Sequence, residues 1–225
     1  MRILSWNCNC KFREKFKEII KYDADIYVIQ ECENPKEYVN TEYIEFAKNY
    51  FWCGDNQNKG LGIFAKDNIR IEKNNWKSYC LRNFLSVRVN DKFNVVGVWA
   101  CNPYIAEYYI YQNINIDSYD ENTIIIGDFN SNKIWDKDNK LRNHSTVVKE
   151  LRNIGLESIY HYIFNEEQGK ETIKTFYLYR HLDKGYHIHH CFANKAIVEK
   201  YQILFDEKWL RYSDHIPIIL KTKDI

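Results

Sequence analysis

The sequence predicts an α/β protein of the α+β kind, a four-layer αββα sandwich in which two packed mixed β-sheets carry helices on their outer faces. About seven to ten β-rich runs are present, which is more than one open sheet usually holds. Helical patterns are interspersed early and late, without strict βαβ alternation. The 225 residues include only 3 Pro and 8 Gly and no Ser/Gly-rich linker, so we expect one domain spanning residues 1–225.

The first half of the chain begins with two expected core strands. Residues 2–8 mix polar and apolar side chains as a strand entering a core does. Residues 25–31 form a second, mainly apolar run that ends on a carboxylate. Between them, apolar residues at helical spacing predict a surface helix over residues 12–20. Residues 59–65 read as a strand whose glycines allow close approach of a neighbouring backbone.

The middle of the chain predicts a hairpin and a covering helix. Residues 84–89 and 93–100 are β-rich and flank Asn90 and Asp91, which is typical of a hairpin turn. The Tyr-rich segment from Tyr104 to about Ile114 is amphipathic and predicts a helix.

The last third predicts one helix and several strands. Ser145 is the expected N-cap of a helix over residues 146–153, and Gly155 is expected to end it. Further strands are expected at residues 175–179, 187–193, around Ile203 and at 216–221.

Residues 123–131 are the stretch on which the functional interpretation depends. Three consecutive isoleucines predict a central strand that is covered on both faces, and we expect Gly127 to break it. Asp128 and Asn130 follow two positions apart, so in an extended backbone their side chains point the same way. Ordinary turn chemistry is the alternative explanation for these residues.

Polar side chains recur where strands end. The set comprises Asn7, Glu31, Asp128, Asn130, Asp214 and His215. Singly, each has a structural explanation, because acids cap helices or lie in loops and a lone histidine is more often a satisfied core residue than a catalyst. Jointly, they predict one polar site at one edge of the sheets.

These residues occur in four motifs: Ser-Trp-Asn at 5–7, Ile-Gln-Glu at 29–31, Gly-Asp-Phe-Asn at 127–130 and Ser-Asp-His-Ile-Pro at 213–217. The ordered set resembles the endonuclease/exonuclease/phosphatase family, and its spelling is closer to the exonuclease III and abasic-site endonuclease branch than to the phosphoinositide branch. Each motif alone is weak, but four in order over residues 1 to about 220 are specific. The resemblance implies the four-layer sandwich and Mg²⁺-dependent hydrolysis of phosphodiesters by in-line attack of water.

The resemblance also implies a role for each residue. Glu31 would be the principal ligand of Mg²⁺, with Mn²⁺ as the alternative ion, and Asp214 and Asn7 would hold water molecules of the metal. Asp128 would orient and deprotonate the attacking water. Asn130 would hold Asp128 or a phosphate oxygen, and His215 would face the phosphoryl oxygen where negative charge develops.

His189 departs from the family pattern. The family has an aspartate that supports the final histidine, and here the corresponding position in Gly185–Phe192 is His189. Strand alternation would place His187 and His189 on one face, with His189 toward His215. Two neighbouring imidazoles are not both protonated cheaply, so we expect weakened activity, a substitute acid such as Asp183, or a shift toward Mn²⁺ or Zn²⁺.

Charge and cysteine content bear on the expected surface, cellular location and substrate of the protein. A formal net charge of +1 argues against a generally basic surface but leaves room for a local basic rim. Seven scattered cysteines are expected to be reduced, and no apolar run is long enough to span a bilayer, so we expect a cytoplasmic monomer. Nucleic acid, with DNA slightly favoured, is the expected substrate. A small nucleotide or phosphoinositide, or non-catalytic binding of nucleic acid, are the alternatives.

Overall fold

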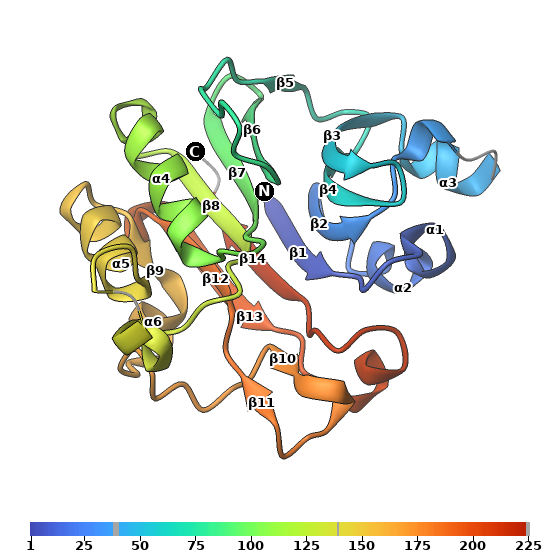
Figure 1. Cartoon of the computed structure of the whole chain (residues 1–225). Coiled ribbons are helices and arrows are strands. Elements are labelled where there is room, and N and C mark those ends of the chain that lie inside the picture. Colours follow the sequence, from blue (N-terminus) through green and yellow to red (C-terminus); the bar gives the residue numbers. More distant parts are fainter. Residues whose placement is uncertain (38–40, 139, 224–225) are drawn as a thin grey trace.

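The computed structural model describes residues 1–37, 41–138 and 140–223, and its strands form two six-stranded sheets and one small two-stranded sheet (Figure 1). The first large sheet has the order β13-β14-β1-β2-β4-β3. Its strands are β1 (Arg2–Asn7), β2 (Ile26–Cys32), β3 (Asn49–Asn56), β4 (Lys59–Ala65), β13 (Val198–Ile203) and β14 (Ile218–Thr222). β1 and β2 are parallel and the other neighbours are antiparallel.

The second large sheet has the order β5-β6-β7-β8-β12-β9. Its strands are β5 (Ile71–Lys73), β6 (Phe84–Val89), β7 (Phe93–Trp99), β8 (Thr123–Asp128), β9 (Glu157–Ser158) and β12 (His189–Ala193). Only β7 and β8 are parallel among these neighbours, so this sheet is mixed as well. The small sheet pairs β10 (Phe176–Tyr177) with β11 (Gly185–Tyr186).

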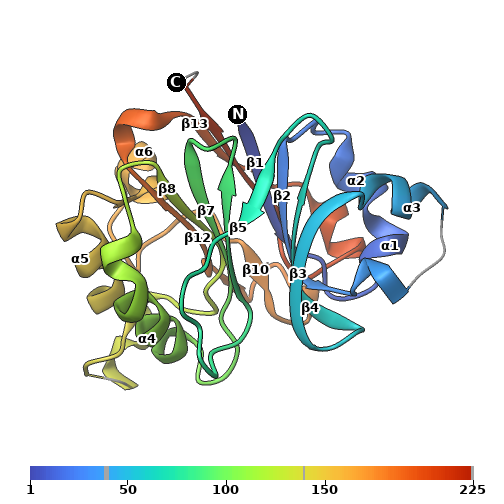
Figure 2. The ribbon, with the colours of Figure 1, turned by 90° about the horizontal axis from the view of Figure 1, so that it is seen from above.

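Helices cover the outer face of each large sheet (Figure 2). Beside the first sheet lie α1 (Phe12–Lys15), α2 (Lys17–Ile20) and α3 (Thr41–Phe46), and beside the second lie α4 (Ile105–Asn115), α5 (His144–Asn153) and α6 (Ile159–Phe164). Short 3-10 turns complete the chain: Pro35–Glu37, Ile116–Ser118, Lys133–Asp138, Leu178–Arg180, Lys195–Ile197 and Glu207–Arg211. None of the described helices is long and apolar enough to cross a membrane.

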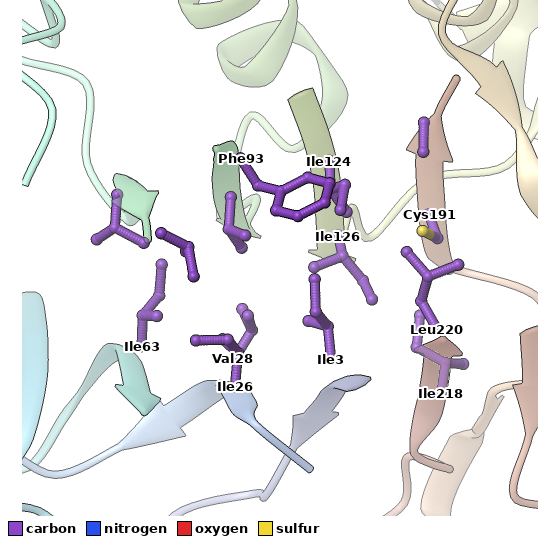
Figure 3. Close-up of a cluster of buried hydrophobic side chains, with 14 of the residues drawn as sticks. Ile3, Ile26, Val28, Ile63, Phe93, Ile124, Ile126, Cys191, Ile218 and Leu220 are labelled. Atoms are coloured by element: carbon purple, nitrogen blue, oxygen red, sulfur yellow. The ribbon is translucent and has the colours of Figure 1, made fainter. Parts of the chain in front are cut away.

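A mainly aliphatic layer of buried side chains holds the two sheets together. Ile3, Val28 and Ile63 project from the first sheet toward Ile124 and Ile126 of the second (Figure 3), and all five are fully buried. Aromatic side chains instead fill the spaces beneath the helices on both outer faces. The predicted four-layer sandwich is therefore confirmed.

β8 is the central strand that the isoleucine run predicted, but it does not end at Gly127. It continues through Asp128 and is buried along its whole length. A Cβ atom on Gly127 would lie 2.0 Å from the Val98 carbonyl oxygen, and the residue has a φ of 156°. The absence of a side chain at Gly127 therefore lets the backbone of β7 pack closely against β8.

Several other sequence predictions differ from the structure at their ends. The helix expected over residues 12–20 divides at Phe16 into α1 and α2. The N-cap of α5 is Asn143, whose side chain accepts from the Thr146 amide, whereas Ser145 lies inside the helix. The strand expected at 175–179 is reduced to β10, because Tyr179 has a positive φ of 53° in a 3-10 turn. β3 had not been predicted.

Candidate active site

The amide of Asn7 joins the two large sheets at the site. Asn7 ends β1 and is 1% exposed, and its Nδ2 donates to Oδ2 of Asp128 at 2.9 Å and to Oε1 of Glu31 at 3.3 Å. Because β1 and β2 are parallel, their carboxyl ends meet at one edge of the first sheet, opposite the end of β8. One donor group therefore holds carboxylates from both sheets.

Glu31 lies at an irregularity of β2. The pairing of β2 with β4 shifts between Gln30 and Cys32, and Glu31 has a positive φ of 60°. Its side chain is 16% exposed, and its Oε2 forms an ion pair with Nζ of Lys59 at 2.9 Å. Burial lowers the pKa of Lys59, but the hydrogen bond and charge of Glu31 outweigh burial, so the pKa is raised overall. The Lys59 ammonium therefore stays positively charged beside the Glu31 carboxylate.

Asp128 is fully buried and accepts hydrogen bonds at both oxygens. The backbone amide of Asn130 donates to Oδ1 at 2.9 Å, and Nδ2 of Asn130 lies 3.2 Å from Oδ2. The turn interpretation therefore holds for this pair, and the turn itself brings the two side chains together. Burial raises the pKa of Asp128, although His215 and the Asn7 amide act in the opposite direction.

Asp214 and His215 reach the site from a segment just before β14. Backbone hydrogen bonds tie this segment to β10, from the Tyr177 amide to the Asp214 carbonyl and from the Ile216 amide to the Thr175 carbonyl. Oδ1 of Asp214 accepts from Nδ2 of Asn9 at 2.9 Å and lies 3.7 Å from Nε2 of His215. Ser213, whose hydroxyl donates to the Asn7 carbonyl at 2.7 Å, anchors the segment to β1.

His189 lies directly against the final histidine. The register of β12 on β8 pairs it with Asp128, and its Nε2 shares a hydrogen bond of 2.9 Å with Nδ1 of His215. Burial, followed by the nearby charge of His215, holds the pKa of His189 well below its usual range. The carboxylates beside His215 are Asp128, at 4.0 Å from Nδ1, and Asp214, whereas Asp183 is exposed.

His187 does not share the environment of His189, contrary to the alternation argument. β12 begins only at His189, so His187 precedes the strand and its ring packs on Tyr160 and His190. His187 and His190 lie with His144 in the interior near α5 and α6. We call these three residues the buried histidine cluster.

The structure adds three site residues that sequence reasoning had missed. Lys59 contacts Glu31, Asn9 contacts Asp214, and Sγ of Cys10 lies 3.8 Å from Oε2 of Glu31. Asn9 and Cys10 follow the first motif within three residues, which was the available signal. Lys59 gave none, because its contact depends on the pairing of β2 with β4.

Solved structures resemble the whole chain. A 3'-5' exonuclease (NExo) from Neisseria meningitidis aligns with a TM-score of 0.69 and 15% identity, covering 99% of this chain and 100% of that chain. An AP endonuclease from Archaeoglobus fulgidus aligns with a TM-score of 0.71 and 15% identity, covering 100% of both chains. The chain has the endonuclease/exonuclease/phosphatase fold.

Other proteins of the endonuclease/exonuclease/phosphatase fold are equally similar. The endonuclease domain of TRAS1, a telomere-specific non-LTR retrotransposon, aligns with a TM-score of 0.68 and 16% identity over 99% of this chain and 97% of that chain. No family model matches the sequence, and no match was found among curated proteins. At this identity the likeness establishes the fold, while the chemistry must be argued from the residues of the site.

Proposed function

We propose that the chain is a metal-dependent phosphodiester hydrolase that acts on nucleic acid, with DNA slightly favoured, by in-line attack of water. The observation that carries this proposal is the convergence of two carboxylates from different sheets on the Asn7 amide, next to a histidine and a third carboxylate. A buried acid, a hydrogen-bond donor and half-buried oxygen ligands are the groups that hydrolysis of an anionic ester requires.

The oxygen donors suit Mg²⁺ or Mn²⁺. Glu31 and Asp214 have side chains that are 16% and 23% exposed, so their oxygens are open to solvent on one side. Mg²⁺ prefers oxygen ligands and keeps several waters, so one or two carboxylates are enough. When bound there, the ion would supply charge neutralisation of the phosphate. Lys59, which now pairs with Glu31, would then be available for a phosphate oxygen.

The remaining residues would position water and substrate. The raised pKa of Asp128 makes this carboxylate a stronger base toward the attacking water, and the amides of Asn7 and Asn130 hold its orientation. His215 would donate a hydrogen bond to the phosphoryl oxygen where charge develops. No serine or cysteine nucleophile is needed in this scheme, so we expect direct hydrolysis.

A second candidate is hydrolysis of a phosphomonoester at a DNA 3' end. One solved structure of the same fold is described as a 3' phosphatase, NExo from Neisseria, bound to product DNA hairpin. Removal of a terminal phosphate uses the same neutralisation and the same water. Hydrolysis of a small nucleotide or phosphoinositide ester and non-catalytic binding of nucleic acid are the remaining alternatives, in that order.

The test is a panel of labelled substrates in Mg²⁺ and in Mn²⁺. It comprises single-stranded, double-stranded, nicked and abasic DNA, DNA with a 3' phosphate, RNA, a mononucleotide ester and an inositol phosphate. We expect cleavage of DNA that is lost with EDTA and restored by the added ion. Hydrolysis of only the small esters would contradict the nucleic-acid proposal, and no hydrolysis of any substrate would contradict the enzymatic one.

A further inference from the structure

We propose that a pocket at the end of the first large sheet remote from the candidate active site binds a small polyphosphate anion, either an inorganic polyphosphate or a nucleoside triphosphate. The pocket has a volume of about 370 Å³ and lies where β1 begins and β14 ends (Figure 2). Arg2 lines it from β1, five residues before Asn7, which is roughly 16 Å along an extended strand. The inference is therefore independent of the proposed hydrolysis.

Three cations lie side by side across the sheet in this pocket. Arg2 of β1 is paired in register with Lys221 of β14, and Lys221 is paired with Lys200 of β13. Residues directly opposite one another in adjacent strands lie on the same face with Cβ atoms roughly 5 Å apart, where like charges destabilise the sheet. An anion bound against the row would relieve this repulsion.

A β-bulge creates one of the two like-charge pairs. The pairing of Val198 with Thr222 sets the register at the start of β13. A regular ladder would then place Glu199 opposite Lys221, but the register shifts and Lys200 takes that position instead. Bulges re-aim side chains and are common beside functional sites. The replacement of an opposite-charge pair by a like-charge pair therefore favours a ligand-binding role for Lys200.

The nearby carboxylates neutralise only one cation of the row. Glu199 forms an ion pair with Lys221 at 2.5 Å. Asp25 accepts from the backbone amide of Arg2 at 2.8 Å, and its other oxygen is engaged by a neighbouring lysine. Within the described parts of the chain, neither the guanidinium of Arg2 nor the ammonium of Lys200 has an ion-pair partner, and both residues are exposed. Two charged donors are thus free to bind an anion.

The width and walls of the pocket indicate the size of the ligand. Three cations on adjacent strands span roughly 10 Å, so one phosphate group cannot contact all of them and a chain of phosphates can. Ile219 and Leu204 add apolar surface, and half-buried Tyr22 adds an aromatic ring. The volume lies at the lower end of the range for small-molecule pockets. These features favour a compact polyphosphate, with room for contact to a nucleoside.

The test is calorimetric titration of the full-length protein with inorganic tripolyphosphate, ATP and orthophosphate in low-salt buffer containing EDTA. EDTA removes divalent ions, so metal-bridged binding and metal-dependent hydrolysis do not contribute. Arg2→Gln and Lys200→Gln remove the two unpaired cations. Lys195→Gln removes an exposed lysine of the preceding turn, and Lys59→Gln removes the cation of the candidate active site. Thermal unfolding of each variant verifies that it is folded.

We expect one equivalent of tripolyphosphate to bind, and orthophosphate to bind more weakly. The affinity for tripolyphosphate should fall at least about tenfold in Arg2→Gln and in Lys200→Gln, since a hydrogen bond to a charged group contributes this much. Lys195→Gln and Lys59→Gln should match the unmodified protein. Tighter binding of ATP than of tripolyphosphate would support the proposal with a nucleotide as ligand, and equal binding would support it with the phosphate chain as the recognised group.

The proposal would be overturned by failure of the unmodified protein to bind tripolyphosphate, or by unchanged affinity in Arg2→Gln and Lys200→Gln. An equal loss in Lys195→Gln would show general charge attraction, and a loss in Lys59→Gln alone would place the anion in the candidate active site. Duplex DNA is added as a competitor, and its displacement of tripolyphosphate would assign the row to a nucleic-acid surface instead. Hydrolysis is not measured, so a failure of the proposed function would leave these outcomes unaffected.

Discussion

His189 sets the charge that the site can carry. Its ring and that of His215 share one hydrogen bond, and burial keeps the pKa of His189 far below neutrality, so His189 is neutral at pH 7. A neutral imidazole supports a neighbouring imidazolium less well than a carboxylate does. The hydrogen bond that His215 could offer to a developing phosphoryl charge is correspondingly weaker.

Replacing His189 with aspartate should therefore raise turnover in Mg²⁺. We expect His189→Asp to increase the single-turnover rate by at least about tenfold, equivalent to roughly 1.4 kcal/mol of barrier, because a carboxylate favours the charged form of His215. The rates are measured for both proteins on the preferred substrate, in Mg²⁺ and in Mn²⁺, from pH 6 to 9. Equal rates throughout would mean that another group holds His215.

At the scale of elements, the pairing of β7 with β8 positions Asp128. Gly127 lies so close to the Val98 carbonyl that a methyl group would have to displace the strand. We expect Gly127→Ala to destabilise the protein by about 1–3 kcal/mol or more and to lower activity by about a hundredfold, since Asp128 would move. Gly155→Ala, whose Cβ would meet no atom within 4 Å but whose φ of 84° is strained for alanine, controls for the loss of a glycine without a clash and should keep the activity of the unmodified protein. Equal activity of the two variants would contradict this role.

The buried histidine cluster should make the packing of α5 on β12 sensitive to acid. Burial lowers the pKa of His144 to about 3, of His187 to about 4 and of His190 to about 3. Unfolded histidines take up protons near pH 6.5, so the unfolded state binds protons first and stability rises with pH between these values. Two further titratable groups face the cluster: His161, whose ring contacts His187, and Glu171, which lies 3.0 Å from the His161 ring.

At pH 5 each cluster histidine would lower the free energy of unfolding by about 2 kcal/mol relative to neutral pH. The three together approach the whole stability of a typical domain. We therefore expect the protein to unfold as the pH falls from about 6.5 toward 4. Circular dichroism measures this transition. His144→Phe, which keeps a ring but cannot be protonated, should move this transition to lower pH even if it costs stability at neutral pH. His181→Ala, an exposed control, should not. An unchanged transition in His144→Phe would show that other groups govern acid unfolding.

For the whole molecule, the strand pattern predicted the architecture well because hydrophobic periodicity reports burial directly. The isoleucines of β8 predicted a central strand, and the β-rich runs on either side of Asn90 and Asp91 predicted the hairpin of β6 and β7. Edge strands such as β3 were missed, since its residues are only partly buried and carry little periodicity. The motif residues could be grouped because each lies at or near the end of a strand. The contact between Lys59 and Glu31 depends on strand register, which local sequence does not encode.

The overall charge leads to a prediction about salt. A formal net charge of +1 gives little general attraction for DNA, so binding of a polymer must rely on local cations such as Lys59. Each phosphate neutralised releases counterions. We expect the apparent KM for duplex DNA to rise roughly tenfold or more between 50 and 200 mM salt, and that for a mononucleotide ester to change much less. Parallel salt responses would point to a small-molecule substrate.

The most direct test of the central claim compares Glu31→Ala with Asp128→Ala in a Mg²⁺ titration of DNA hydrolysis. Both should keep the unfolding temperature of the unmodified protein within a few degrees and lose about 100- to 10,000-fold in rate. Glu31→Ala should also raise the Mg²⁺ concentration for half-activity or abolish Mg²⁺ binding, whereas Asp128→Ala should leave Mg²⁺ binding largely in place. Glu37→Ala, an exposed glutamate nearby in sequence, is the matched control. If both site variants turned over like the unmodified protein with the same Mg²⁺ response, the assignment of the site would be wrong.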